Sequence, residues 1–95
     1  MTLTEYQQAA NQTRSKSPLR LIYAIMGLCA QAGKIASLHR KAYLSEGKIG
    51  PDHIDRISKT LGDALWYIAE TATTLQLDLQ KIAHHNLEIL RQTHT

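Results

Sequence analysis

The sequence is poor in the residues that mark disulfide-rich and fibrous proteins. Its 95 residues include one cysteine, two prolines, five glycines and no phenylalanine. The single cysteine, Cys29, excludes an internal disulfide and fits a reducing cytoplasm. So little glycine and proline excludes collagen-like and proline-rich chains. The composition is that of a small globular protein, which we expect to form one domain over residues 1–95.

Signals for secretion or for crossing a membrane are also lacking. The longest uninterrupted apolar run, from Leu21 to Ala30, is about half the ~20 residues that a membrane-spanning helix needs. No basic region followed by an apolar core opens the chain, so no secretory signal is predicted. We therefore expect a cytoplasmic protein with no membrane partner.

The charge balance and the reactive side chains point to no familiar site. The 11 basic and 8 acidic residues give a formal net charge of +3, which is too small to predict a nucleic-acid partner. The five histidines form no i, i+4 pair on one helix and no pairing with Cys29, so no transition-metal site is predicted. No glycine-rich phosphate loop and no Ser/His/acid arrangement is visible.

Two helices are predicted in the first half of the chain. Thr4 followed by Gln7 resembles a capping box, which predicts a short first helix. Ser17 and Pro18 predict the start of a second helix, with the serine as N-cap and the proline at the first helical position. No breaker follows before residues 45–47, so this helix is expected to be long.

Two more helices are predicted in the second half. Gly50 and Pro51 predict the start of a third helix, which is expected to reach about Gln76. Asp78 is a candidate N-cap for the last helix. No segment alternates with period two over the length of a strand, so the predicted fold class is all-α with four helices. A short loop joins the two long central helices, which makes them antiparallel neighbours.

Apolar residues recur every three or four positions along both long helices. In the second helix they are Leu21, Ile25, Leu28, Ala32 and Ile35. In the third helix they are Ile54, Ile57, Leu61, Leu65, Ile68, Ala72 and Leu75. Residues 61–69 are apolar on nearly every side except at Asp63, and a chain this short has too little protein to bury such a helix alone. We therefore expect a homodimer or tetramer.

Four polar residues lie at matching heights on the two long helices. Gln31 and Lys34 lie about as far before the connecting loop as Thr60 and Asp63 lie after it. Each pair is spaced i, i+3 and so occupies one stripe of its helix. If the stripes face the same side, the four side chains converge and Lys34 pairs with Asp63. Otherwise Lys34 is a solvated surface lysine and Asp63 pairs with Lys59 one turn away.

Nearly the whole chain resembles one family. The stretch LIYAIMGLCAQAGKIASL resembles the second helix of MazG-type nucleoside triphosphate pyrophosphohydrolases. KTLGDALWYIAETATTLQLDLQKIAHHNLEILRQ resembles their third and fourth helices, and LTEYQQAA their first. The resemblance implies a four-helix MazG-like bundle that is completed by dimerisation.

The resemblance also implies a degenerate metal site. Members of that family hold Mg²⁺ through acids arranged E-x-x-E on the second helix and E-x-x-D on the third, and split a triphosphate into pyrophosphate and a nucleoside monophosphate. Gln31, Lys34 and Thr60 stand at three of these positions, so Asp63 alone remains as a metal ligand. Their charges sum to zero instead of minus four, and an ammonium group cannot accept a metal. No Mg²⁺-dependent hydrolysis of the family's kind, and no certain cofactor, is expected.

Some of the positions that hold substrate in that family carry matching residues in this chain. Trp66 and Tyr67 match an aromatic pair near the family's pocket. The family's last helix resembles E-x-N-x-x-K, of which this chain keeps Asn86 and has His84 and Ile89 at the glutamate and lysine positions. Together with Lys34 and Asp63, these residues are the candidates for binding a nucleotide.

Three functions remain open. The leading one is a degenerate homologue, a pseudoenzyme that retains nucleotide binding or a protein interaction. One alternative is an active (d)NTP pyrophosphohydrolase with relocated Mg²⁺ ligands, for which Glu70 and Glu46 are the nearest acids. The other is a structural oligomerisation module.

Overall fold

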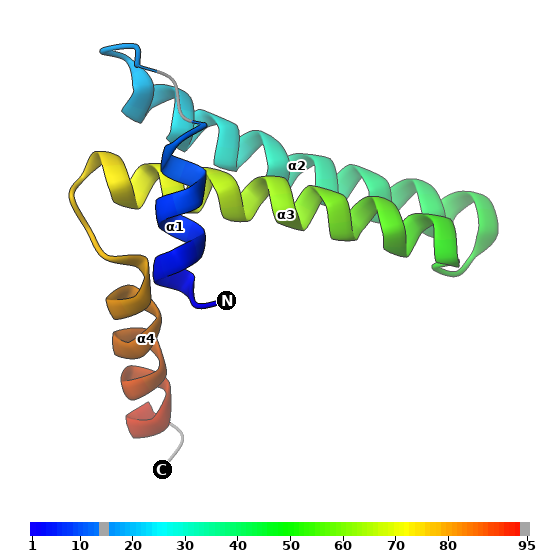
Figure 1. The fold of residues 1–95 in the computed structure, drawn as a ribbon. Coiled ribbons are helices and arrows are strands. Elements are labelled where there is room, and N and C mark those ends of the chain that lie inside the picture. The colour runs from blue at the N-terminus through cyan, green and yellow to red at the C-terminus, as the bar shows by residue number, and fades with distance from the viewer. Residues whose placement is uncertain (14–15, 94–95) are drawn as a thin grey trace.

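The protein is a four-helix, all-α structure built around a long antiparallel hairpin. The computed structural model describes residues 1–13 and 16–93, without the side chain of Glu46. The helices are α1 (Leu3–Asn11), α2 (Arg20–Glu46), α3 (Pro51–Thr74) and α4 (Leu79–Thr93). Helices α2 and α3 lie side by side along their lengths, while α1 crosses α3 and α4 leaves the hairpin at a steep angle (Figure 1). The predicted fold class is confirmed, including the two long central helices.

The start of α2 differs from the prediction. The helix begins at Arg20, and the hydroxyl oxygen of Ser17 accepts a hydrogen bond from the backbone N–H of Leu19 at 3.1 Å. Ser17 therefore closes a turn ahead of the helix instead of capping it. The predicted end is confirmed: Gly47 follows the last helical residue with φ 69°, a left-handed conformation that glycine adopts without steric cost.

The boundaries of α3 and α4 follow the predicted signals closely. Pro51 occupies the first position of α3 with Gly50 as its N-cap, and the helix ends at Thr74, two residues short of the prediction. Gln76 has φ 60° in the turn that follows. A carboxylate oxygen of Asp78 accepts from the backbone N–H of Gln80 at 2.9 Å, which confirms it as the cap of α4.

The capping box of α1 lies two residues before the predicted one. Thr2 accepts from the backbone N–H of Glu5 at 3.0 Å, and Glu5 accepts from the backbone N–H of Thr2 at 2.9 Å. These hydrogen bonds stabilise the carboxylate and lower the pKa of Glu5 below its ordinary value. The prediction that Thr4 and Gln7 form the box is wrong, because Gln7 is engaged elsewhere.

Gln7 ties α1 to the turn between α3 and α4. Its amide nitrogen donates to the hydroxyl of Thr73 at 3.1 Å and to the carbonyl of Leu77 at 2.8 Å. Its amide oxygen accepts from the backbone N–H of Leu79 at 2.8 Å. One side chain therefore binds a hydroxyl in the last turn of α3 and two backbone groups at the turn into α4, one of them an N–H that the helix start would leave unpaired.

The contact line between α2 and α3 is made of small residues. Ala24 and Ala42 of α2 and Thr60 and Ala64 of α3 are buried. A Cβ atom at Gly27 would overlap the ring of Tyr67, so this glycine lets the tyrosine lie directly against the α2 backbone. Separately, Ala10, Ala69 and Leu79 form a small core where α1 meets α3 and α4, with Leu3, Tyr6 and Trp66 packed against it.

The larger apolar residues lie mostly outside this contact line. Ile25 is 47% exposed, Leu61 is 54% exposed and Ile68 is 39% exposed. The predicted stripes therefore have the correct helical period, but several of their members do not pack between α2 and α3. Residues Arg20–Ser45 are also long and apolar enough to cross a membrane by length and composition alone, and few of them are buried inside the chain.

We predict that Gly27→Ala destabilises the fold. Displacing the packed ring of Tyr67 costs about 1–3 kcal/mol, which exceeds the gain of up to about 1 kcal/mol in helix propensity. The control is Gly33→Ala on the same helix, where a Cβ meets nothing within 4 Å and the melting temperature should rise. Equal shifts in both variants, measured by circular dichroism, would contradict the close packing.

Gln7→Ala should loosen the junction of α1, α3 and α4. Loss of three hydrogen bonds, at about 0.5–1.5 kcal/mol each, should lower the free energy of unfolding by about 2–3 kcal/mol. The amide of Leu79 should also exchange faster with deuterium. Gln8→Ala, at an exposed neighbouring position, should change stability by less than about 0.5 kcal/mol. A Gln7 variant as stable as the Gln8 variant would contradict this role.

Candidate functional site

Gln31 and Asp63 meet at one cavity between the two long helices. This cavity has a volume of about 280 Å³ and is lined by Gln31 of α2 and by Asp63, Trp66 and Tyr67 of α3. Two of the four polar residues whose convergence was considered therefore line one cavity. The side-chain oxygen of Gln31 is buried and has no hydrogen-bond partner among the described residues. The cavity thus has a buried acceptor next to a carboxylate.

A second cavity lies on the other side of the same aromatic pair. It measures about 210 Å³ and is lined by Arg20, Tyr23 and Ala24 of α2 and by Trp66, Tyr67 and Glu70 of α3. Glu70 is 3% exposed and lies seven residues after Asp63, which places it on the same stripe of α3 two turns further on. The two cavities form a row of polar sites separated by Trp66 and Tyr67.

Trp66 and Tyr67 are held by the fold itself. Their rings contact edge to face with centroids 5.1 Å apart and an interplanar angle of 87°. The indole nitrogen of Trp66 donates to the hydroxyl of Thr13 at 2.9 Å, and that hydroxyl donates to the carbonyl of Ala10 at 2.7 Å. Trp66 therefore joins α3 to the end of α1, and Tyr67 fills the space over Gly27. The pair lines both cavities.

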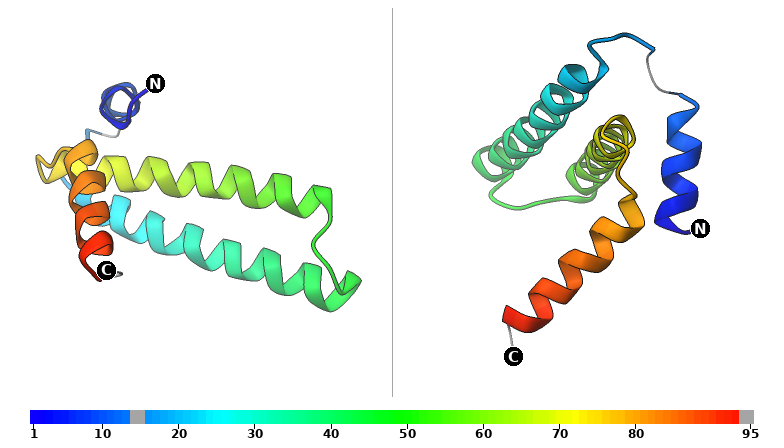
Figure 2. Two further views of the ribbon diagram at one scale, coloured as in Figure 1. Left: turned by 90° about the horizontal axis from the view of Figure 1, so that it is seen from below. Right: turned by 90° about the vertical axis from the view of Figure 1, so that its left-hand side faces the viewer.

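The structure does not bring the remaining predicted residues into the cavity. Thr60 is 1% exposed, and its hydroxyl donates to the carbonyl of Arg56 at 2.8 Å within the helix. Lys34 is exposed one turn beyond Gln31. Asn86 is exposed on α4, which diverges from the hairpin (Figure 2). The expected convergence of four polar side chains is therefore reduced to Gln31 and Asp63.

The donor set of the cavity does not fit Mg²⁺. A magnesium ion takes near-octahedral oxygen ligands, usually with one or two carboxylates and bound phosphates. Asp63 is the one carboxylate that lines this cavity, and Glu70 lies beyond the aromatic pair beside Arg20. Within residues 1–13 and 16–93, no three His, Cys, Asp or Glu side chains are grouped closely enough to hold a metal. Glu46, the other candidate acid, has its side chain outside the described residues.

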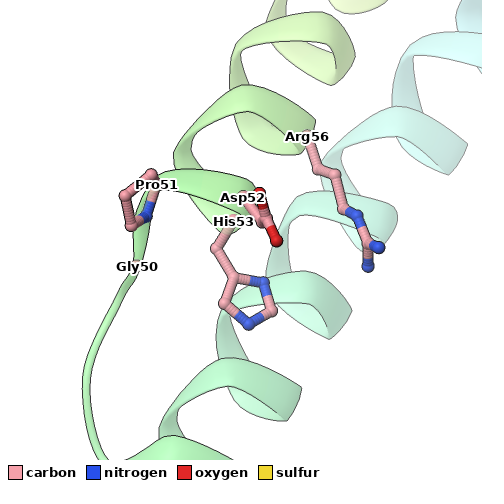
Figure 3. A pocket seen from close by; sticks show the side chains of 5 residues that line it. All are labelled: Gly50, Pro51, Asp52, His53 and Arg56. Atoms are coloured by element: carbon pink, nitrogen blue, oxygen red, sulfur yellow. The ribbon is translucent and has the colours of Figure 1, made fainter.

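A larger cavity lies at the opposite end of the hairpin. It has a volume of about 420 Å³ at the start of α3 and is lined by Gly50, Pro51, Asp52, His53 and Arg56 (Figure 3). The Nδ1 atom of His53 is buried without a hydrogen-bond partner among the described residues. Arg56 and Asp63 are two helical turns apart, about 10 Å along α3, so this cavity is separate from the predicted site.

Arg20 and Tyr23 were not among the candidate residues, and Glu70 was named only as a possible relocated Mg²⁺ ligand. Arg20 and Ala24 precede Gly27 and Gln31 at intervals of four, three and four, which places them on one stripe of α2. The same spacing links Asp63 to Glu70. Extending the stripe that contains Gln31 by three turns, and the stripe that contains Asp63 by two turns, would have found Arg20 and Glu70.

Comparison with known proteins gives one distant relative and no family. The chain is 35% identical to the gene 37 protein of Mycobacterium phage L5 over 72 residues, which are 75% of this chain and 63% of that protein. The chain thus matches less than two thirds of its relative's length. No family model matches the sequence, and no solved structure matches it.

We predict that divalent ions leave the stability of the protein unchanged. With one carboxylate at the cavity, neither millimolar Mg²⁺ nor its removal with EDTA should shift the melting temperature measured by differential scanning fluorimetry. Asp63→Ala serves as the control variant. A rise with Mg²⁺ in the wild type that is absent from Asp63→Ala would establish a metal site.

Proposed function

We propose that this chain is a cytoplasmic, degenerate homologue of the MazG-type pyrophosphohydrolases that binds a nucleotide without efficient Mg²⁺-dependent hydrolysis and associates with itself. The observation that carries the proposal is the cavity in which Gln31, Asp63 and two fixed aromatic rings meet. The sequence resemblance supports the nucleotide as ligand, and the long α2–α3 hairpin is consistent with the bundle that it implies. The presence of one carboxylate at the cavity supports the proposal that Mg²⁺-dependent hydrolysis has been lost.

The buried oxygen of Gln31 favours a ligand with N–H groups. An unpaired buried acceptor costs about 1–3 kcal/mol, which a donor on a ligand would recover once the Gln31 side chain turns its oxygen toward the cavity. The amino or imide edge of a nucleobase supplies such donors, and Asp63 offers a second acceptor beside Gln31. Tyr67 and Trp66 supply the apolar walls that a base prefers.

Lys34 provides the complementary charge for a phosphate. It is exposed on α2 one turn beyond Gln31, about 5 Å further along the helix axis. A solvated ammonium group attracts a phosphate directly, without a bridging metal ion. Within the described residues no ion pair engages Lys34, so its charge is available to a ligand.

The exposed surface of the chain supports self-association. Its accessible surface is 7167 Å², against about 5,500 Å² for a typical folded monomer of 10.7 kDa. Its radius of gyration is 15.8 Å, against about 12 Å for a compact chain of this length. Helix α4 adds Ile82, Leu87 and Leu90, each more than 40% exposed. This surface also favours the structural oligomerisation module as the second candidate function.

Nucleotide binding should appear as thermal stabilisation without divalent ions. A nucleotide at ten times its dissociation constant stabilises the folded state by about 1.4 kcal/mol, which raises the melting temperature of a domain this size by roughly 5–10 °C. Lys34→Glu should abolish the shift, whereas Lys41→Glu, two turns further along α2 and also exposed, should keep it. No shift with any millimolar ribo- or deoxynucleotide would leave the oligomerisation module as the better description.

Hydrolysis is tested by pyrophosphate release. We expect no turnover of ribo- or deoxynucleoside triphosphates with Mg²⁺ or Mn²⁺, because three of the four implied ligand positions carry no carboxylate. Turnover by the wild type that Asp63→Ala abolishes would instead support the active enzyme with relocated ligands.

A further inference from the structure

The cavity at the start of α3, here called the α3-start cavity, gathers three ionisable side chains. It has a volume of about 420 Å³ and is lined by Gly50, Pro51, Asp52, His53 and Arg56. His53 and Asp52 lie about 60° and 40° round the helix from Arg56, so the three side chains share one face of the first two turns. Figure 3 shows them extending from the same side of α3. The volume is within the range of small-molecule sites, about 300–1,000 Å³.

His53 presents a buried nitrogen to this cavity. Its Nδ1 atom is buried and has no hydrogen-bond partner among the described residues. Such an atom costs free energy until a ligand pairs with it. Nδ1 carries a proton in the charged ring and in one of the two neutral tautomers, so it can donate a hydrogen bond to an anion.

Arg56 brings a permanent positive charge to the same cavity. Within residues 1–13 and 16–93 no ion pair engages it, not even with Asp52 one turn earlier. The guanidinium group presents its N–H donors in a planar fork, which matches two oxygens of one phosphate group. Its charge and its donors are therefore available to a ligand.

The start of α3 adds backbone donors. The N-cap is Gly50, and no side chain caps this end of the helix. The first intrahelical hydrogen bond runs from the N–H of Ile54 to the carbonyl of Gly50 at 3.1 Å. The N–H groups of Asp52 and His53 precede that bond and lie at the positive end of the helix dipole. Phosphates accept hydrogen bonds from such groups.

Asp52 is the one lining side chain that opposes an anion. A carboxylate in the first turn stabilises an empty helix start, which gives Asp52 a role in the absence of a ligand. A metal ion would need more than this acid and His53, and no group of three His, Cys, Asp or Glu side chains occurs among the described residues. The donors of the cavity therefore favour an anion over a cation.

We propose that the α3-start cavity binds the phosphate group of a small molecule. The guanidinium of Arg56, Nδ1 of His53 and the backbone N–H groups at the start of α3 are its donors. Arg56 and Asp63 are about 10 Å apart along α3, so this site is separate from the candidate nucleotide site and does not depend on it.

Titration with inorganic phosphate at constant ionic strength, followed by heteronuclear NMR spectroscopy, tests the site. We expect saturable shifts of the amide signals of Asp52 and His53. Arg56→Gln should weaken binding about tenfold or more, because it removes a hydrogen bond between charged groups. Lys59→Gln removes the same charge at an exposed position one turn further along α3, outside the cavity. It should change the affinity by less than about twofold.

Asp52→Asn distinguishes an anion from a cation. The variant should bind phosphate about threefold more tightly or better, because a like charge next to the ligand is removed. Weaker phosphate binding by this variant would overturn the proposal. Circular dichroism of the Asp52 and Arg56 variants reports whether the helices persist.

Glycerol phosphate distinguishes the two sources of the phosphate group. Tighter binding of glycerol phosphate than of inorganic phosphate would assign the cavity to phosphate esters, and equal affinity would assign it to free phosphate. Both results support the site, provided that Arg56→Gln weakens both ligands.

Three results would overturn the site. They are the absence of phosphate-induced shifts at Asp52 and His53, equal weakening by Arg56→Gln and Lys59→Gln, and a response to Zn²⁺ instead of phosphate that Asp52→Asn abolishes. Lys34→Glu should leave the shifts at the α3-start cavity unchanged. A failure of nucleotide binding and a failure of this site are therefore measured separately.

Discussion

The close approach of α2 and α3 is the constraint on which the rest of the structure depends. Among the described residues, the buried apolar positions are six alanines and Leu79. Alanines and Gly27 let the two backbones approach, but they remove little apolar surface from water compared with leucine or isoleucine. The hairpin is therefore close-packed with a thin core. The large aliphatic side chains that would normally supply the stability of a small domain lie on its outer surfaces.

The sequence predicts where the helices begin and end better than it predicts which helix faces pack against one another. Gly47, Pro51 and Asp78 lie at helix ends, as predicted. Gly47 ends α2, Pro51 begins α3 and Asp78 caps α4, and each of these effects acts within a few residues along the chain. The apolar stripes also have the observed period. Periodicity alone does not say which neighbour a stripe meets, and alanine carries too weak a signal to mark the contact line that Ala24 and Ala64 form.

The candidate site is predicted in part for a similar geometric reason. Counting outward from the loop places Gln31 and Asp63 at similar heights, and both line one cavity, because antiparallel helices of equal rise keep such residues together. The pair offered from the sequence, Lys34 with Asp63, is not found among the described residues. An i, i+3 spacing still separates two side chains by about 60° round the helix. That rotation carries Thr60 into the contact line and Lys34 out to solvent. Spacing along one helix therefore indicates a shared stripe, but not a shared cavity.

The small number of carboxylates at this cavity has a consequence for folding as well as for chemistry. Acids grouped closely at one site repel one another, so a fold that groups them depends on the metal that neutralises them. Asp63 is the one carboxylate that lines this cavity, so closing the hairpin brings no second acid against it there. The cavity is lined by a side-chain amide, one carboxylate and two aromatic rings. These favour recognition of a ligand, and the thin core then leaves stability to depend on contacts outside the site.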